Sequence, residues 1–369
     1  MTALRFERRM EQKWWLHVMV PLGAVVGALV LGSIFFLFTD RPPLSVYSKM
    51  FEAAFGSRDG ITDTLATASP LILTGLAAAF AMRMGLYNIG GEGQLYAGAI
   101  ASSGAALLWT DGMPTPPAMA VVFAAGAFGG MVWILVPALA RAYLGTSEII
   151  TTLMFVLVAD RLLDYLILGS SSYWKDPLSF GFPQGKVIPD AAQFPPWFDS
   201  RVTVALVVAV AMVLLLWFVW AHTSFGYGMK VVGDAPHAAR YAGIPERRTV
   251  LVTLLISGSL AGMAGAAEIG ARAFRLDPAG LRLSIGFTGI VIAALSRCNP
   301  FAVALVAILL GGLQNAGQSI QTASDIDVPK SVSLMLQGAI LLFVLGGETF
   351  VRYRVVHGRS ALRAAGAST

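Results

Sequence analysis

Cysteine and charged residues are both scarce in this sequence. Its 369 residues include one cysteine, Cys298, so no disulfide can form within the chain. Charged residues make up 13% of the chain, about half of the roughly 25% found in ordinary soluble domains. Hydrophobic residues make up 56%. This composition excludes an ordinary soluble domain and predicts an all-α, polytopic membrane protein.

Catalytic and nucleotide-binding motifs are missing as well. The sequence contains no GxxxxGK[ST], no HExxH, no GxSxG and no CxxC. We therefore expect no catalytic residue, no metal site and no cofactor in this chain, and we expect any ATP to be used by a separate subunit. The 26 Lys and Arg residues lie in short clusters between apolar runs, a placement typical of membrane topology and not of a nucleic-acid surface.

Ten apolar runs predict about ten transmembrane helices. The first follows the basic segment RFERRMEQK and has no small-residue cleavage site, so we interpret it as a retained helix. The expected transmembrane domain covers 16–347, between an N-terminal segment, 1–15, and a basic tail, 348–369. The predicted spans are 16–38, 61–83, 91–109, 118–140, 147–169, 201–221, 249–267, 284–297, 300–320 and 331–347.

Lys and Arg gather on one side of this topology. With the N-terminus inside, the cytoplasmic side receives Lys230, Arg240 and the tail arginines. The arginines expected outside often have acidic neighbours, as Arg41 has Asp40 and Arg58 has Asp59. The positive-inside rule therefore predicts that both termini lie in the cytoplasm.

The long outer loop, 170–200, contains many aromatic residues and five prolines. Two interpretations stay open: an aromatic belt at the membrane interface, and a surface that receives a soluble binding protein. A second outer segment, 268–283, brings Glu268, Arg272 and Arg282 close together in the sequence. Those charges either pair with the same partner or are solvated.

Two predicted spans are irregular. Residues 85–93 place four glycines near the start of a span, and 284–297 has only 14 residues. Both patterns predict a broken or re-entrant helix, which hydrocarbon tolerates only where protein or water covers the freed backbone groups. A weak similarity between 73–81 and 256–265, which would cross in opposite directions, hints at an inverted repeat.

A few polar residues lie within or beside the spans. A charge at the bilayer centre costs roughly 2.5–3.5 kcal/mol on insertion scales, so Glu92 either lines a solute path or caps neighbouring N–H groups. Asn88 and Gln94 each donate and accept hydrogen bonds, which suits the hydroxyls and base edges of a neutral solute. Asn315 and Gln318 complete the candidate path residues.

Spacing alone suggests two further roles. Arg161 and Asp164 lie three residues apart beside Asp160, which favours a structural ion pair over a transport site. Gly23 with Gly27, and Gly258 with Gly262, have the small-residue spacing that lets helices approach closely. We interpret these glycines as packing positions.

The polar segment 222–248 stands between two long apolar runs. Its residues 225–228, FGYG, predict a flexible exit from the preceding helix, and Asp234 followed by Pro236 predicts an N-cap and the first turn of a short helix over 236–241. Gly243 is suited to the left-handed helix end. A two-turn helix with small outward residues, expected at Ala238, Ala239 and Ala242, fits a groove on another protein.

Two motifs of this sequence, at 85–99 and at 233–244, resemble motifs that occur in the same order in a known family. The segment at 233–244 resembles the cytoplasmic coupling loop of ABC-importer permeases in the branched-chain amino acid, ribose and nucleoside superfamily. The stretch GLYNIGGEGQLYAGA at 85–99 is similar to the pattern of nucleoside and simple-sugar permeases. The resemblance covers about residues 10–350. It implies ATPase coupling through Gly233, Asp234, Pro236, Ala238, Ala239, Arg240, Gly243 and Ile244.

The resemblance implies a permease subunit of a bacterial ABC importer in the cytoplasmic (inner) membrane. Its expected partners are an ABC ATPase, a second related permease in a heterodimer, an extracytoplasmic substrate-binding lipoprotein and membrane lipid. Nucleosides are the first choice of solute and simple sugars such as ribose the second. A rival interpretation is an ion-coupled secondary transporter with Glu92 or Asp160 carrying a proton. An integral membrane enzyme is weaker still, because no paired catalytic groups stand out.

Overall fold

The computed structural model describes residues 4–8, 16–38, 41–169, 172–179, 181, 183–197, 200–322 and 331–357. Part of the expected N-terminal segment, 9–15, and most of the expected basic tail, 358–369, lie outside the described residues. The chain divides into two units, Met1–Ser48 with Val328–Thr369, and Lys49–Asp327.

The first unit pairs the two ends of the chain. Helix α1 (Leu16–Phe38) packs along α14 (Ser331–Arg352). Strand β1 (Leu4–Arg8) pairs antiparallel with β2 (Tyr353–His357), so that Leu4 lies opposite His357. A Cβ atom on Gly27 would lie 3.1 Å from the ring of Phe343, whereas one on Gly23 would have nothing within 4 Å. Of the two predicted packing glycines in α1, only Gly27 therefore lies at a close approach.

The second unit is a helix bundle. Helix α2 (Pro43–Phe55) begins in the first unit and ends in the second. The bundle then contains α3 (Arg58–Met82), α4 (Gly91–Trp109), α5 (Thr115–Leu139), α6 (Glu148–Asp164), α7 (Val204–His222), α8 (Ser224–Asp234), α9 (Pro236–Tyr241), α10 (Glu246–Glu268), α11 (Pro278–Leu281), α12 (Ile285–Leu295) and α13 (Pro300–Thr322). Short π-helical turns continue α5, α6 and α10 at Ala140–Leu144, Tyr165–Gly169 and Ile269–Ala273. One 3-10 turn, Asp190–Ala192, lies in the outer loop.

The all-α, polytopic fold class is confirmed. Within the described residues, six helices are long and apolar enough to cross a membrane, and the bent pair Leu22–Phe38 with Pro43–Phe55 would make a seventh. Each of the ten predicted spans coincides with a helix, but the count of ten spans is not confirmed. Helix α4 is rich in glycine, serine and polar residues, and α12 has only 11 residues, so neither alone has the composition and length of a simple span.

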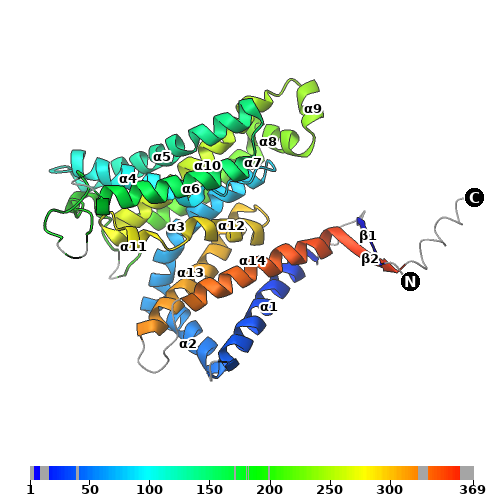
Figure 1. Cartoon of the computed structure of the whole chain (residues 1–369), viewed down its shortest axis with the longest axis horizontal. Coiled ribbons are helices and arrows are strands. Elements are labelled where there is room, and N and C mark those ends of the chain that lie inside the picture. Colours follow the sequence, from blue (N-terminus) through cyan, green and yellow to red (C-terminus); the bar gives the residue numbers. More distant parts are fainter. Residues whose placement is uncertain are drawn as a thin grey trace, which may run out of the picture. The chain divides into compact units, whose positions relative to one another are not determined.

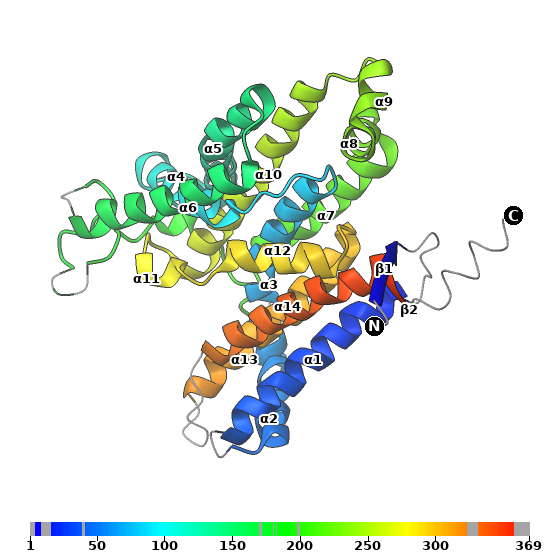
Figure 2. The same ribbon diagram turned by 45° about the vertical axis from the view of Figure 1, so that its right-hand side comes forward.

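Helices α3 and α10 cross in opposite directions at the centre of this unit. The Ser257 hydroxyl donates to the Ala77 carbonyl, and the Thr253 hydroxyl lies 3.4 Å from the sulfur of Met84, so residue numbers rise along α3 as they fall along α10. Helix α3 packs against α12 and α13, as α10 packs against α4 and α5 (Figure 2). The predicted antiparallel crossing is confirmed. Each of the two crossing helices packs against its own pair of neighbours, which fits an inverted repeat.

Glycines allow the closest helix contacts. A Cβ atom on Gly262 would lie 2.1 Å from the carbonyl oxygen of Gly126 in α5, and one on Gly130 would lie 2.2 Å from the oxygen of Gly258. On the α4 side, a Cβ on Gly98 would lie 2.3 Å from the oxygen of Gly262. The predicted packing role of Gly258 and Gly262 is confirmed, because α10 approaches both neighbours at backbone distance.

Candidate functional site

Two helix N-termini meet at Glu92. Helix α4 begins at Gly91 and α12 at Ile285, and the side chain of Glu92 is buried, with 2% of the residue exposed. One carboxylate oxygen accepts a hydrogen bond from the backbone N–H of Gly286 at 2.6 Å, and the other accepts from the Tyr96 hydroxyl at 2.8 Å. The N-cap residue of α12, Ser284, makes no side-chain cap hydrogen bond. Glu92 therefore caps α12 from another helix.

This carboxylate lies at the N-terminal ends of two helices at once. It belongs to the first turn of α4 and also accepts from the first turn of α12, where unpaired N–H groups and the helix dipole favour negative charge. A Cβ atom on Gly286 would lie 2.3 Å from the backbone nitrogen of Glu92. Only glycine permits this approach of the two helix ends.

Asn88 and Gln94 bond to each other instead of facing open space. The Asn88 amide nitrogen donates to the Gln94 side-chain oxygen, and the Gln94 nitrogen donates back, each at 2.9 Å. Asn88 also donates to the Ser257 hydroxyl at 2.9 Å and accepts from the backbone N–H of Gly90 at 3.1 Å. Because Ser257 donates to Ala77, these bonds join α3, α4, α10 and the link between α3 and α4. We call Asn88, Glu92, Gln94, Ser257 and Gly286 the helix junction.

The link 83–90 is an irregular connection between α3 and α4, and α4 itself is continuous, so the predicted broken or re-entrant helix is not confirmed here. Helix α3 ends at Met82, and Gly85 takes a φ of +74°, the left-handed conformation that favours glycine. The backbone N–H of Tyr87 donates to the carboxylate of Glu148, which also pairs with Arg141 at 3.2 Å. Ser284, before α12, takes a φ of +56°, but Pro278–Leu295 is long and apolar enough to be one span, so a broken or re-entrant helix is not confirmed there either. The link is therefore held by α6 as well as by the helix junction.

The segment 222–248 contains two helices where one was predicted. Helix α9, Pro236–Tyr241, has the predicted bounds, with proline in its first turn and Gly243 at a φ of +71°. The predicted flexible exit at 225–228 is wrong, because these residues are part of α8, whose N-cap Thr223 accepts from the N–H of Gly226 at 3.1 Å. The rings of Phe225 and Phe80 stack, which gives α8 a tertiary contact that a flexible exit would lack.

Two details of the predicted coupling helix are also wrong. Asp234 is not the N-cap of α9, because it is the last residue of α8 and Ala235 takes the cap position without a side-chain hydrogen bond. Ala239 is fully buried and not outward, whereas Ala238 and Ala242 are exposed as predicted. The backbone N–H of Ile244 donates to the carbonyl of Ala239, so the turn after α9 folds back on it.

The exposed side of α8 and α9 is aromatic and basic. Tyr241 is 95% exposed and Tyr227 is 67% exposed, and Pro236 and His237 are exposed beside them. Arg240 pairs with Glu246 at 2.9 Å, with its side chain largely exposed. In Figure 1, α8 and α9 lie at the end of the second unit opposite the outer loop and α11. We call Tyr227, Pro236, His237, Arg240 and Tyr241 the α8–α9 surface.

This surface is joined to the link at backbone distance. A Cβ atom on Gly233 would lie 2.8 Å from the carbonyl oxygen of Met84, so α8 rests directly on the first residues after α3. Trp220 stacks on Phe80, and the Arg83 guanidinium lies 4.7 Å from the Trp220 ring centroid. These contacts join the ends of α3 and α7, and α8 contacts both helices, through the stacking of Phe225 on Phe80 and the approach of Gly226 to Val219.

Asn315 and Gln318 lie on α13 with different surroundings. The Asn315 amide donates to the Gly60 carbonyl at 3.2 Å and to the Thr64 hydroxyl at 3.4 Å, both in α3. Gln318 is exposed, and Gln314, one turn earlier, is buried. Of the five predicted path residues, Gln318 is exposed, while the amides of Asn88, Gln94 and Asn315 and the carboxylate of Glu92 bond to protein groups.

Asp160 and Asp164 on α6 have an ion-pair partner that sequence spacing could not reveal. Arg282, between α11 and α12, lies 2.8 Å from Asp160 and 2.7 Å from Asp164. The predicted pair of Arg161 with Asp164 is present but longer, at 3.5 Å. These ion pairs hold the segment before α12 against the end of α6.

The outer loop folds onto the bundle. The ring of Phe194 is buried and stacks on Phe123, and its backbone N–H donates to the carbonyl of Gly270. The Trp174 indole donates to the carbonyl of Ile100 at 3.1 Å. These two aromatic residues therefore pack against α4 and α5, which neither interpretation of the loop had anticipated.

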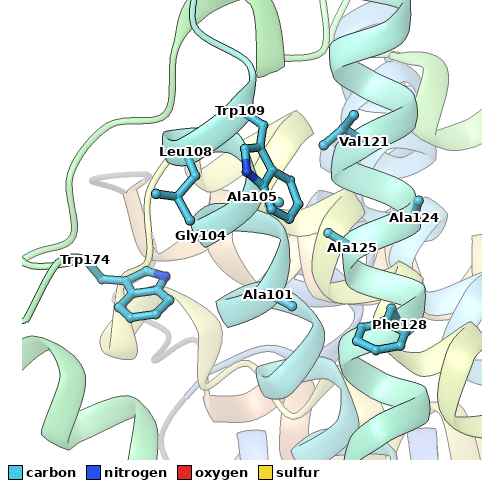
Figure 3. A pocket seen from close by; sticks show the side chains of 10 residues that line it. All are labelled: Ala101, Gly104, Ala105, Leu108, Trp109, Val121, Ala124, Ala125, Phe128 and Trp174. Atoms are coloured by element: carbon cyan, nitrogen blue, oxygen red, sulfur yellow. The ribbon is translucent and has the colours of Figure 1, made fainter.

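Beside Trp174 lies a groove of about 500 Å³ between α4 and α5 (Figure 3). Trp109 and Trp174 supply the only polar side-chain atoms in its lining, which otherwise consists of alanine, glycine, leucine, valine and phenylalanine. Such a surface suits apolar groups and offers few hydrogen bonds to a hydroxylated solute. Within the described part of the chain, no three His, Cys, Asp or Glu side chains gather in a possible metal site.

Comparison with known proteins gives one consistent result. Residues 60–345 match the family described as "Branched-chain amino acid transport system / permease component". A glucose ABC transporter permease protein of Haloferax volcanii is 33% identical over 95% of this chain and 93% of its own length. A guanosine ABC transporter permease protein of Bacillus subtilis is 32% identical, over 89% of this chain and 93% of its own length. A nucleoside ABC transporter permease protein of Lactococcus lactis is 32% identical, over 89% and 90%. No solved structure matches the chain.

Proposed function

The chain belongs to the family of branched-chain amino acid transport system permease components, and on that basis we propose that it is the membrane-spanning subunit of an ABC importer for nucleosides. Two relatives at 32% identity bear the names of guanosine and nucleoside permeases. A permease of this kind is a transport subunit and not an enzyme. Simple sugars are the second candidate, because a relative at 33% identity is named as a glucose permease.

The observation that supports coupling to a separate ATPase is the α8–α9 surface. An exposed tyrosine on a short, proline-started helix is a strong candidate for an interface anchor, since Tyr is enriched among the residues that dominate binding energy. The residues predicted for this role are Gly233, Asp234, Pro236, Ala238, Ala239, Arg240, Gly243 and Ile244. Of these, Ala239 and Ile244 would act by shaping the segment, because they face inward or pack on α8.

The mechanism that fits is alternating access. Closure of the ATPase subunits on ATP displaces α9, and the helices of the permease pair then open to receive solute. The α8–α9 surface faces the cytoplasm in this proposal, with both termini on that side of the bacterial cytoplasmic membrane. Gln318, whose side chain is exposed, is the path residue best placed to contact the solute.

Three partners complete the proposal. A second, related permease forms the other half of the path, an extracytoplasmic lipoprotein delivers the solute, and an ABC ATPase supplies the energy. The chain has no nucleotide-binding loop of its own, so its movement has to be driven from outside. The ion-coupled alternative would use Glu92, whose carboxyl group accepts hydrogen bonds from Gly286 and Tyr96, or Asp160, which pairs with Arg282.

The test is loss of the Tyr241 ring. In Tyr241→Ala, we expect normal insertion in the membrane, at least a tenfold loss of ATPase co-purification and a matching loss of guanosine uptake, because the interface loses its anchor. The control is Leu178→Ala, which removes an 81% exposed side chain from the outer loop. Unchanged ATPase association in Tyr241→Ala would remove the α8–α9 surface from the proposal.

A further inference from the structure

The polar side chains of the helix junction have few hydrogen-bonding groups left for a solute. The Asn88 side chain donates two hydrogen bonds and accepts two, which is the full set of donors and acceptor lone pairs of a carboxamide. Gln94 donates one and accepts one with the same partner. A nucleoside or sugar would have to break these buried bonds before it could make its own, at a cost of roughly 1–3 kcal/mol for each group left unpaired.

The two carboxylate oxygens of Glu92 are also occupied by hydrogen bonds from protein groups. Its two oxygens accept from Gly286 and Tyr96, and Gly286 lies so close that a single methyl group would not fit. Its carboxyl group lies at the N-terminal ends of α4 and α12, where helix dipoles favour negative charge. Displacing α4 without α12 would expose a buried carboxylate and unpaired N–H groups, so the two helix ends are held to move together.

The link 83–90 connects the helix junction to the α8–α9 surface. Gly233 rests on the backbone of Met84, and the contact has no side chain between the two segments to absorb a shift. Met84 also contacts Thr253 of α10, and four residues later Asn88 bonds to Ser257 of the same helix. A displacement of α8 is therefore transmitted to the link, and through the link to α4 and α10.

We propose that Asn88, Glu92 and Gln94 are positioning residues that make α4 and α12 follow the displacement of α8, and that they do not contact the solute. This role rests on the proposed function as an ATP-driven permease. It assigns the GLYNIGGEGQ segment to mechanical coupling, while solute contact falls to other residues such as Gln318.

The test separates coupling from solute binding. Gln94→Met removes the amide at nearly constant size, and Gln318→Met makes the same chemical change on α13. Each variant is assembled with its ATPase, second permease and binding protein in proteoliposomes. Guanosine uptake and ATP hydrolysis are then measured against guanosine concentration.

For Gln94→Met we expect the KM for guanosine to stay within twofold, ATP hydrolysis to continue, and the guanosine transported per ATP hydrolysed to fall at least fivefold. Glu92→Gln, which keeps the side-chain shape and loses the charge, should give the same pattern. Gln318→Met, which changes a proposed solute contact, should instead raise the KM for guanosine.

A KM raised tenfold in Gln94→Met with transport per ATP unchanged would overturn the proposal, because a solute contact gives that result. Unchanged KM and unchanged transport per ATP would overturn it as well. If Gln94→Met and Glu92→Gln assemble poorly, Ser257→Ala removes two bonds of the same set, the one from Asn88 and the one to Ala77, and its transport per ATP decides the question. Failure of the proposed function shows separately, as ATP-independent uptake by the unmodified assembly.

Discussion

At the scale of single residues, Glu92 explains why a carboxylate is tolerated in the middle of an apolar bundle. It is buried, and the N–H of Gly286 and the Tyr96 hydroxyl replace part of its lost hydration. The glycines on either side predicted a break and left two roles open, path lining and capping. The geometry supplies the capping contacts, whereas path lining by Glu92 remains an untested prediction.

Two neighbouring glycines at this site should respond differently to the same substitution. In Gly286→Ala the new methyl group meets the backbone nitrogen of Glu92 at 2.3 Å, and in Gly91→Ala its nearest atom is the Gly286 oxygen at 3.7 Å. We expect Gly286→Ala to destabilise the protein by about 1–3 kcal/mol, the usual cost of overpacking. Thermal unfolding of the detergent-solubilised protein measures the difference, with Gly91→Ala as the matched control. Equal melting temperatures would contradict the close approach of α4 and α12.

The residue pairs that the sequence could not reveal are the distant ones. Asp160 and Asp164 were assigned to Arg161 because spacing within a helix is visible in the sequence. Their closer partner, Arg282, comes from a segment more than 110 positions away, and only the folded chain brings it near. The sequence also did not reveal that Asn88 and Gln94 bond to each other. An amide that can donate to and accept from a solute can do the same with another amide.

At the scale of helices, local chemistry predicted α9 to the residue. A proline that fits only the first turn and a glycine that fits the left-handed end define its length. The same reasoning failed at α8, where the glycines at 226 and 228 were interpreted as flexibility. Gly226 instead allows α8 to lie against the end of α7, since a Cβ there would fall 2.3 Å from the Val219 oxygen. Tertiary contact thus overrides low helix propensity.

The three-helix contact of α10 with α4 and α5 predicts a second sensitive position. In Gly262→Ala the new methyl group would lie 2.1 Å from the Gly126 oxygen, so α5 has to move away and lose its contacts with α10. We expect a loss of stability of about 1–3 kcal/mol, seen as a lower melting temperature and a lower purified yield. Gly23→Ala in α1 is the control, because nothing lies within 4 Å of the new atom. A Gly262→Ala protein as stable as Gly23→Ala would contradict this packing.

At the scale of the whole molecule, composition and apolar runs were enough to predict the fold class. The number of spans was harder to predict from hydropathy. Helix α4 contains Glu92, Gln94 and several glycines, and α12 has only 11 residues and reaches the length of a span only within the longer segment Pro278–Leu295. The inverted crossing of α3 and α10 was visible only as a faint sequence similarity, because packing at the crossing depends on small residues of several kinds.

A chain without a nucleotide-binding loop can take part in ATP-driven transport if the movement of a partner reaches its helices. The α8–α9 surface lies at one end of the second unit, and a continuous set of backbone contacts and buried hydrogen bonds leads from it to the N-termini of α4 and α12.

The most direct measurement is guanosine uptake into proteoliposomes that contain this chain either alone or with its ABC ATPase, second permease and binding protein. We expect uptake only by the full assembly and only with ATP, with no response to a proton or sodium gradient. Uptake by the chain alone, driven by an ion gradient and independent of ATP, would contradict the account.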